Sequence, residues 1–210
     1  MGERTKGKPV VGIVGGIGAG KSTVAAEIVR MGGRLIDADK IGHEVLGDPE
    51  VSREIRRRWG DGVFAPDGRV DRQALGREAF SDRRELDALS RITHPLIRRG
   101  IQRRIAEAVS DPAARLIVLD AAVLFEAGWD DLCTHVVFVD APDEARAKRA
   151  AAQRGWDQAA WRGREIMQIS LDKKRRKCDY TIDNSSSVSC LQEQTRQLLH
   201  KILRPAECAQ

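Results

Sequence analysis

The chain has few aromatic residues and only a modest excess of positive charge. Its 210 residues include four Phe, four Trp and one Tyr, and 36 basic against 31 acidic residues give a formal net charge of +5. Proteins that bind nucleic acid combine strong positive charge with aromatic side chains on which bases stack. The composition therefore counts against an ATPase that acts on nucleic acid, and we expect no nucleic-acid partner.

Cysteine and long apolar runs are also scarce. The chain has four cysteines, Cys133, Cys178, Cys190 and Cys208, and none of them shows the Cys-x-x-Cys spacing. Neither a zinc site nor a disulfide framework is indicated, so we expect reduced thiols. No apolar run approaches the ~18 residues of a membrane span, and residues 1–8 lack the apolar core of a signal peptide. We expect a soluble, cytoplasmic protein with no membrane partner.

The most informative segment that is present is a glycine-rich loop. Residues 15–22 read Gly-Gly-Ile-Gly-Ala-Gly-Lys-Ser and fit the phosphate-binding pattern G-x-x-x-x-G-K-[ST] in full. A β-branched apolar run precedes the loop and helical spacing follows it, which is the order that this chemistry requires. The glycines let backbone N–H groups approach an anion, Lys21 can reach the β- and γ-phosphates, and Ser22 can ligate Mg²⁺. We therefore predict a nucleotide site rather than a simple strand-to-helix turn.

Five short apolar runs predict the strands of a buried parallel sheet. They lie at residues 10–14, 34–37, 115–119, 135–140 and 180–183, and helical segments separate them. This alternation predicts a doubly wound α/β fold with a five-stranded parallel sheet. Ligands of such sheets bind beyond the carboxyl ends of the strands, where the sequence places Asp37, Asp39, Asp120 and Asn184.

Two long helical stretches interrupt the strands. Residues 46–114 are expected to form a helical insertion over the acceptor site, with helices at 51–59, 72–80, 83–92 and 95–109. His94-Pro95 favours the start of the last helix, because proline suits a first helical turn. Residues 144–177 are dense in Arg and Lys and are expected to form a lid. Most of these cations are expected to be solvated, while one or two, with Arg149 and Arg154 as candidates, contact ATP.

Three polar residues at strand ends have competing interpretations. Asp39 could accept the proton of an acceptor hydroxyl during phosphoryl transfer, or it could cap the following helix, and the two uses are compatible. Asp120 could position Mg²⁺ through water, or it could be an ordinary turn former. Asn184 begins a polar stretch after the last strand that reads equally well as a turn.

Together these motifs resemble the dephospho-coenzyme A kinase family. The matching elements are Gly-Gly-Ile-Gly-Ala-Gly-Lys-Ser-Thr at 15–23, Ile-Asp-Ala-Asp at 36–39, His-Pro-Leu-Ile at 94–97, Leu-Phe-Glu at 124–126, Lys148-Arg149, Arg164 with Gln168, and Asp-Tyr-Thr-Ile-Asp-Asn at 179–184. They follow the family's order and span residues 10–203. The glycine loop is shared by many kinases, whereas the remaining elements together are specific to this family.

The resemblance implies a P-loop NTPase-like kinase that spans residues 9–204. Its core would comprise 9–45, 115–143 and 178–204, its helical acceptor-binding insertion 46–114 and its lid 144–177. It would transfer the γ-phosphate of ATP, with Mg²⁺, to the 3′-hydroxyl of dephospho-CoA, in the last step of coenzyme A synthesis. We expect a monomer or a weak homo-oligomer.

With the residue-level interpretations above, the resemblance predicts a set of site residues. The catalytic residues are Lys21, Asp39 and Arg149. The ATP-binding residues are Gly18, Ala19, Gly20, Lys21, Ser22, Thr23 and Asn184; Asp39, His94 and Glu126 bind the acceptor, and Ser22 and Asp120 hold the metal.

The chain departs from the family at four places. Val14 replaces a common Thr, Ala122 a frequent Pro and Arg146 a frequent Gln, and one extra residue separates Arg149 from Arg154. A nucleoside or nucleotide monophosphate kinase shares the core and the mechanism, but it does not need the 36–39 and 94–97 elements in this arrangement. A nucleotide switch or GTPase is disfavoured, because the chain contains no Asn-Lys-x-Asp motif.

Overall fold

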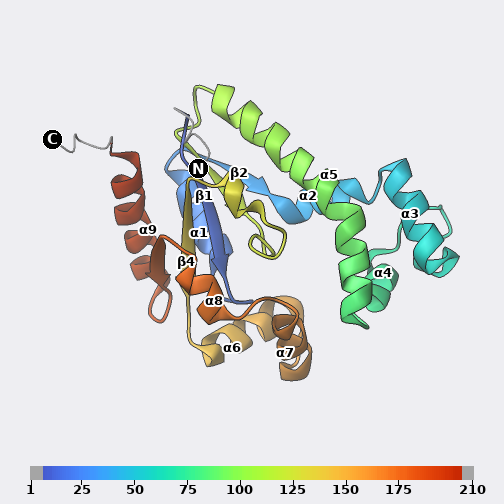
Figure 1. Cartoon of the computed structure of the whole chain (residues 1–210). Coiled ribbons are helices and arrows are strands. Elements are labelled where there is room, and N and C mark those ends of the chain that lie inside the picture. The colour runs from blue at the N-terminus through green and yellow to red at the C-terminus, as the bar shows by residue number, and fades with distance from the viewer. Residues whose placement is uncertain (1–6, 205–210) are drawn as a thin grey trace. The chain divides into compact units, whose positions relative to one another are not determined.

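The chain divides into two compact units. The computed structural model describes residues 7–204, apart from the side chains of residues 153 and 154. Unit 1 runs up to Asp37 and resumes at Arg104, and unit 2 is Ala38–Arg103. In Figure 1 the blue and the yellow-to-red elements belong to unit 1, and the light-blue to green helices belong mostly to unit 2.

Unit 1 is built on a five-stranded sheet in which every strand pairing is parallel (Figure 1). The strands are β1 (Val10–Gly15), β2 (Gly33–Asp37), β3 (Leu116–Asp120), β4 (His135–Asp140) and β5 (Tyr180–Asp183), in the order β2-β3-β1-β4-β5. The chain winds to both sides of β1, which confirms the predicted doubly wound sheet. Crevices for ligands form at the carboxyl end of the strand where the winding reverses, which here is β1.

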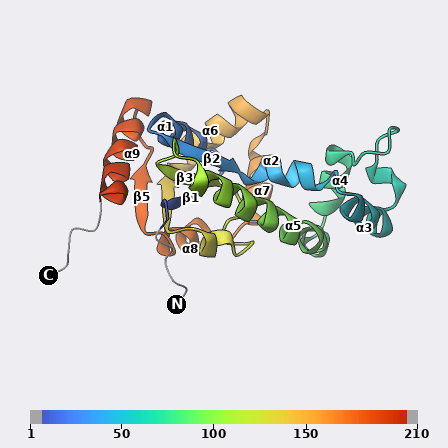
Figure 2. The ribbon, with the colours of Figure 1, turned by 90° about the horizontal axis from the view of Figure 1, so that it is seen from above.

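The central strands are apolar along their whole length because both faces of the sheet are covered. All six residues of β1 and the first four of β3 are buried. In one core cluster Val24 and Ile28 of α1 (Lys21–Arg30) and Leu191 and Leu199 of α9 (Val188–Leu203) pack with strand residues. Figure 2 shows α1 and α9 beside the sheet from above. Burial on both faces explains why these strands appear in the sequence as continuous apolar runs.

Cys133 packs against the central strand of the sheet. A Cβ on Gly12 of β1 would lie 2.8 Å from the Cys133 sulfur, so this thiol lies directly against the strand. Burial, with the nearby Asp130 and Asp131, raises the pKa of the Cys133 thiol to about 12 and keeps it protonated. Cys133, Cys178 and Cys190 are free thiols, as expected, and Cys208 lies outside the described residues.

Unit 2 is helical. Its helices are α2 (Ala38–Val45), α3 (Pro49–Trp59), α4 (Arg72–Ala79) and most of α5 (Arg83–Ser110), with a 3-10 turn at Asp61–Val63. Aspartates begin two of them: the Asp48 carboxylate accepts from the first N–H groups of α3, and Asp71 does the same for α4. A small cluster of Val51, Ile55 and Leu75 forms its interior.

The expected helix start at His94-Pro95 is wrong. Pro95 lies inside α5, which runs unbroken from Arg83 to Ser110. An internal proline removes one backbone hydrogen bond and costs about 3 kcal/mol. Apolar packing on both sides of Pro95 offsets this cost, because Leu89, Ile92 and Leu96 all pack on the unit 2 cluster. Tertiary contacts therefore override the local signal.

The predicted lid segment of unit 1 holds three short helices. They are α6 (Asp143–Arg154), α7 (Gln158–Ile166) and α8 (Leu171–Arg176). Gly155, with φ +64°, ends α6, and the side chains of Asp157 and Ser170 cap α7 and α8. Within residues 7–204 no helix has both the length and the apolar character needed to cross a membrane.

Candidate nucleotide-binding site

The glycine loop joins β1 to α1 and has the backbone shape of an anion site. Gly18 and Gly20 have φ angles of +79° and +102°, which only glycine adopts without strain. Gly20 is the N-cap of α1 and supplies no side chain to bond the first N–H groups of the helix. Those N–H groups and the positive end of the helix dipole are therefore directed at whatever anion the loop holds.

Five successive carbonyl groups of this loop are held by side-chain donors. Because a peptide's C=O and N–H point in opposite directions, a donor that fixes a carbonyl also fixes the direction of the next residue's N–H. The Lys21 ammonium donates to Gly15 O (3.1 Å) and Gly16 O (3.0 Å). The next carbonyl, Ile17 O, accepts from Trp161 Nε1 at 3.3 Å and from Arg146 Nη1 at 3.5 Å. Gly18 O accepts from Arg149 Nη1 at 3.3 Å, and Ala19 O accepts from Asn184 Nδ2 at 2.7 Å.

Asn184 supports the loop from the end of β5. Its side chain is buried, and its backbone N–H donates to Asp140 O at 2.7 Å. A Cβ on Gly20 would overlap the Asn184 amide, so the two residues are in close contact. Ser185 also bonds the Asp183 carboxylate through its N–H at 2.9 Å, so residues 183–185 form a turn as well. The turn interpretation is therefore confirmed, and the Asn184 side chain also bonds the loop at Ala19 O.

Like Arg146, Arg149 of the predicted lid segment contacts the loop. It donates to Gly18 O and, at 3.4 Å, to Asn184 O. The side chain of Arg154, the other expected lid cation, lies outside the described residues. Lys148, next to Arg149, instead pairs with Glu144 on the exposed face of α6.

Asp120 ends β3 beside the loop strand. The sheet register pairs it with Ile13 of β1 on one side and with Asp37 of β2 on the other. Two carboxylates therefore lie on adjacent strands at the carboxyl edge of the sheet, one strand from the loop. Ser22 is the second residue of α1 and belongs to the same end of the sheet.

Glu126 forms a buried ion pair instead of facing a groove. Its Oε1 accepts from Lys174 Nζ at 3.1 Å and from the Ile169 N–H at 3.0 Å, and only 1% of the Lys174 side chain is exposed. Its Oε2 is buried and has no hydrogen-bond partner. The pair ties the segment after β3 to α8.

The two remaining predicted residues belong to unit 2. Asp39 is the second residue of α2, which begins at Ala38, so Asp37 and not Asp39 occupies the N-cap position; the capping interpretation of Asp39 is wrong. His94 is half-buried in α5, and burial lowers the pKa of its imidazole, which is therefore neutral at pH 7. α2 and α5 pack closely, since a Cβ on Gly100 would lie 2.6 Å from Ile41.

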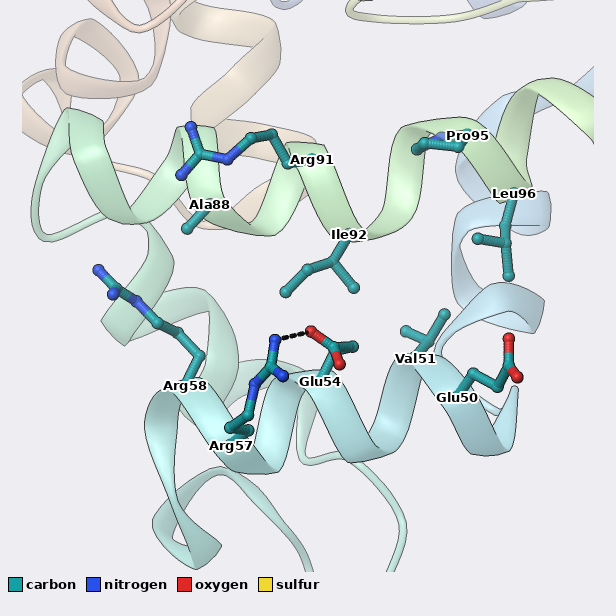
Figure 3. Close-up of a pocket in the computed structure, with 10 residues that line it drawn as sticks. All are labelled: Glu50, Val51, Glu54, Arg57, Arg58, Ala88, Arg91, Ile92, Pro95 and Leu96. Atoms are coloured by element: carbon teal, nitrogen blue, oxygen red, sulfur yellow. Dashed lines mark hydrogen bonds and ion pairs between the residues drawn. The ribbon is translucent and has the colours of Figure 1, made fainter.

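Unit 2 also contains a groove of about 680 Å³ between α3 and α5. Figure 3 shows Val51, Ile92 and Leu96 directed into the space between the two helices, with the Arg57–Glu54 ion pair at its edge. The groove has an apolar centre and arginines along its rim. The lining residues are Glu50, Val51, Glu54, Arg57, Arg58, Ala88, Arg91, Ile92, Pro95 and Leu96.

Comparison with known proteins identifies the family. The family described as dephospho-CoA kinase matches residues 9–189. The dephospho-CoA kinase of Syntrophotalea carbinolica is 37% identical over 196 residues, which cover 92% of each chain. The structure of TT1252 from Thermus thermophilus has a TM-score of 0.79 at 31% identity and covers 94% of this chain and 99% of its own. The dephospho-CoA kinase from Campylobacter jejuni, at 24% identity and TM-score 0.68, covers 93% and 97% and shares the fold.

The chain belongs to the dephospho-CoA kinase family. It is therefore a kinase, with the P-loop kinase fold expected from the sequence, and ATP is its phosphoryl donor.

The donor set of this kinase suits Mg²⁺. The ion prefers oxygen ligands, keeps several of its waters and needs only one or two protein groups beside the phosphates. The Ser22 hydroxyl and the Asp120 carboxylate supply such groups. Among the described residues no cluster of three or more His, Cys, Asp or Glu forms a cage for a metal. The arrangement fits an ion bound largely through the nucleotide.

The sequence did not reveal Arg146 and Trp161 as part of the site. Arg146 belongs to a run of cations on a helix, a pattern typical of solvated faces, and Trp161 follows no motif. The one available signal was that Arg146 departs from the family pattern. Both side chains prove to be buried, at 1% and 3% exposure, against the loop.

We predict that Gly20→Ala abolishes ATP binding, because the substitution adds a Cβ at φ +102° that overlaps the Asn184 amide. Gly68→Ala is the matched control, since Gly68 has φ +80° but open space around it. Calorimetric titration with ATP should show no binding to folded Gly20→Ala and wild-type binding to Gly68→Ala. Equal ATP affinity in both variants would refute the assigned contact.

Proposed function

We propose that the chain transfers the γ-phosphoryl group of ATP to the 3′-hydroxyl of dephospho-CoA. ATP-dependent phosphorylation of dephospho-CoA is the reaction of the family and the last step of coenzyme A biosynthesis. The observation that carries the proposal is the glycine loop, whose carbonyls accept from side-chain donors over five consecutive residues. Residues 18–23 bind the phosphates through backbone N–H groups of the loop and of the first turn of α1, apart from Ala19 N–H and Thr23 N–H, which donate to Gly16 O and Gly20 O.

In this proposal unit 1 stabilises the transferring group. Lys21 and Arg149 neutralise the charge that builds on the phosphoryl oxygens. Ser22 and Asp120 would hold Mg²⁺, which would supply positive charge against the phosphate oxygens. The lid, residues 144–177, brings one or two of its cations, with Arg149 among them, over the nucleotide, and Asn184 keeps the loop in shape.

The acceptor side draws on unit 2 in this proposal. Asp39 accepts the proton of the 3′-hydroxyl as its oxygen bonds to the γ-phosphorus and the bond to the bridging oxygen of ADP breaks. The neutral His94 imidazole can donate or accept a hydrogen bond to the acceptor. Glu126, which is tied to Lys174, orders the segment after β3. The insertion at 46–114 binds the acceptor, and the groove between α3 and α5 offers it an apolar channel rimmed by arginines.

The substrate assignment is tested by measuring ATP consumption with different acceptors. Dephospho-CoA should give rapid turnover with a product phosphorylated at the 3′ position, as shown by mass spectrometry and phosphorus NMR. Nucleoside monophosphates and DNA should not stimulate ATP consumption. Faster turnover with a nucleoside monophosphate would favour the alternative kinase class.

Lys21→Ala is expected to lower kcat by about 10²–10³, the usual effect of losing one transition-state donor. The fold should survive, because the loop shape comes from its glycines and from the remaining carbonyl donors. Steady-state kinetics with purified protein and a melting curve check both statements. Lys173→Ala, which removes an exposed lysine of α8, should match the wild type in both. Near-normal turnover in Lys21→Ala would remove this residue from the mechanism.

Asp39→Asn is expected to slow phosphorylation of dephospho-CoA by about 10²–10⁴, because the amide cannot take the proton. Melting temperature and ATP affinity should stay close to wild type, since Asp39 is exposed in the first turn of α2. Asp67→Asn, in an exposed turn of the same unit, serves as the control. If both variants turn over normally, Asp39 is a surface residue and another group takes the proton.

Arg91→Ala is expected to raise the KM for dephospho-CoA several-fold and to leave the ATP affinity unchanged, because Arg91 lines the groove of unit 2. Arg53 lies on α3 with its side chain 73% exposed and outside the groove lining, so Arg53→Ala is the matched control. Steady-state titration of each substrate separates the two effects. An unchanged KM in Arg91→Ala would exclude this groove from acceptor binding.

A further inference from the structure

Arg146 is a buried cation whose partners lie on α6, on α7 and in the glycine loop. Only 1% of its side chain is exposed. Nη1 and Nη2 donate to the two carboxylate oxygens of Glu165 on α7, and Nη2 donates to Asp143 at 2.6 Å. Nη1 also lies 3.5 Å from Ile17 O in the glycine loop. A cation buried this deeply needs paired carboxylates, and both Nη atoms of Arg146 have them, while its Nε is buried without a hydrogen-bond partner.

Trp161 of α7 reaches the same loop carbonyl. Its indole N–H donates to Ile17 O at 3.3 Å, and its ring lies 5.0 Å from the Arg146 guanidinium, within cation–π range. Trp161 is 3% exposed. One carbonyl of the loop therefore receives donors from two helices of the lid segment.

The loop is in contact with Arg146 along its outer side. A Cβ on Gly16 would overlap the Arg146 guanidinium, and a Cβ on Gly18 would overlap the Arg146 backbone carbonyl. The absence of a side chain at these two positions thus leaves room for Arg146, and it also lets the loop curve. The side chain fills the back of the loop, on the carbonyl side.

We propose that Arg146, Trp161 and Glu165 form a latch on the Ile17 carbonyl that sets the orientation of the Ile17–Gly18 peptide and so aims the Gly18 N–H at the nucleotide phosphates. The three are positioning residues, because they act through the loop and not on the substrate. The proposal rests on the nucleotide site proposed above. It gives α7, within the proposed lid segment, a direct part in shaping the loop.

The test uses substitutions that remove a donor and leave the packing in place. Trp161→Phe deletes the indole N–H and keeps an aromatic ring beside Arg146. Arg146→Lys keeps the charge but loses the planar guanidinium, which donates to Glu165 and to Ile17 O at the same time. Trp59→Phe is the control: it deletes the indole N–H that bonds Glu85 at 2.8 Å in unit 2.

Two measurements report on the latch. The first is the dissociation constant for ATP without acceptor, which should rise about two- to ten-fold in Trp161→Phe and at least as much in Arg146→Lys, as expected for one lost hydrogen bond. The second is amide hydrogen exchange without nucleotide, which should be faster in residues 16–20 and unchanged in β5. Trp59→Phe should alter neither, even if its melting temperature falls as far as that of Trp161→Phe.

Each other outcome has a definite meaning. If Trp161→Phe and Arg146→Lys lower the melting temperature while ATP affinity and loop exchange stay at wild-type values, these residues only stabilise the fold and the latch is refuted. If Arg146→Lys instead lowers kcat more than 100-fold with unchanged ATP affinity, Arg146 acts on the transferring phosphate and the positioning assignment is refuted. If wild-type protein binds ATP but does not phosphorylate dephospho-CoA, the proposed function fails, and the ATP-affinity test of the latch still applies.

Discussion

The nucleotide site depends on how the carbonyl side of the glycine loop is bonded. A loop of four glycines within six residues has little intrinsic preference for one shape, and glycine loses more conformational freedom on folding than any other residue. Lys21, Trp161, Arg146, Arg149 and Asn184 restrict it from outside, one carbonyl after another. These donors come from α1, α6, α7 and the end of β5. Four separate elements of unit 1 therefore contribute to the shape of the loop at residues 15–22.

The sequence predicted the sheet almost completely because its strands are short apolar runs between helical stretches, and all five were found to within one residue at each end. Burial on both faces accounts for the continuous apolar runs of the central strands β1 and β3, whereas the edge strands β2 and β5 are partly exposed. The loop was predicted for a different reason: the glycines and Lys21 are required by the geometry of phosphate binding itself. In both cases one physical requirement acts on consecutive residues, so it leaves a contiguous pattern that a single sequence can display.

The parts that the sequence did not predict depend on contacts between distant residues. Pro95 looks like a helix start, and only packing of Leu89 and Leu96 on the core of unit 2 explains why α5 continues through it. The burial of Arg146 depends on Glu165, nineteen residues later, and on the loop, which lies more than a hundred residues earlier. No local pattern separates this arginine from the solvated cations around it.

The two arginines on α6 that contact the loop differ in how their charges are compensated. Arg146 is paired with the carboxylates of Glu165 and Asp143, so its charge is largely neutralised within the protein. Arg149, three residues later and so on the same face of the helix, donates to the carbonyl oxygens of Gly18 and Asn184. A carbonyl dipole orients a guanidinium without cancelling its charge. The positive charge of Arg149 therefore remains able to attract a phosphate, whereas Arg146 is suited to fixing the loop. The same helix supplies both side chains.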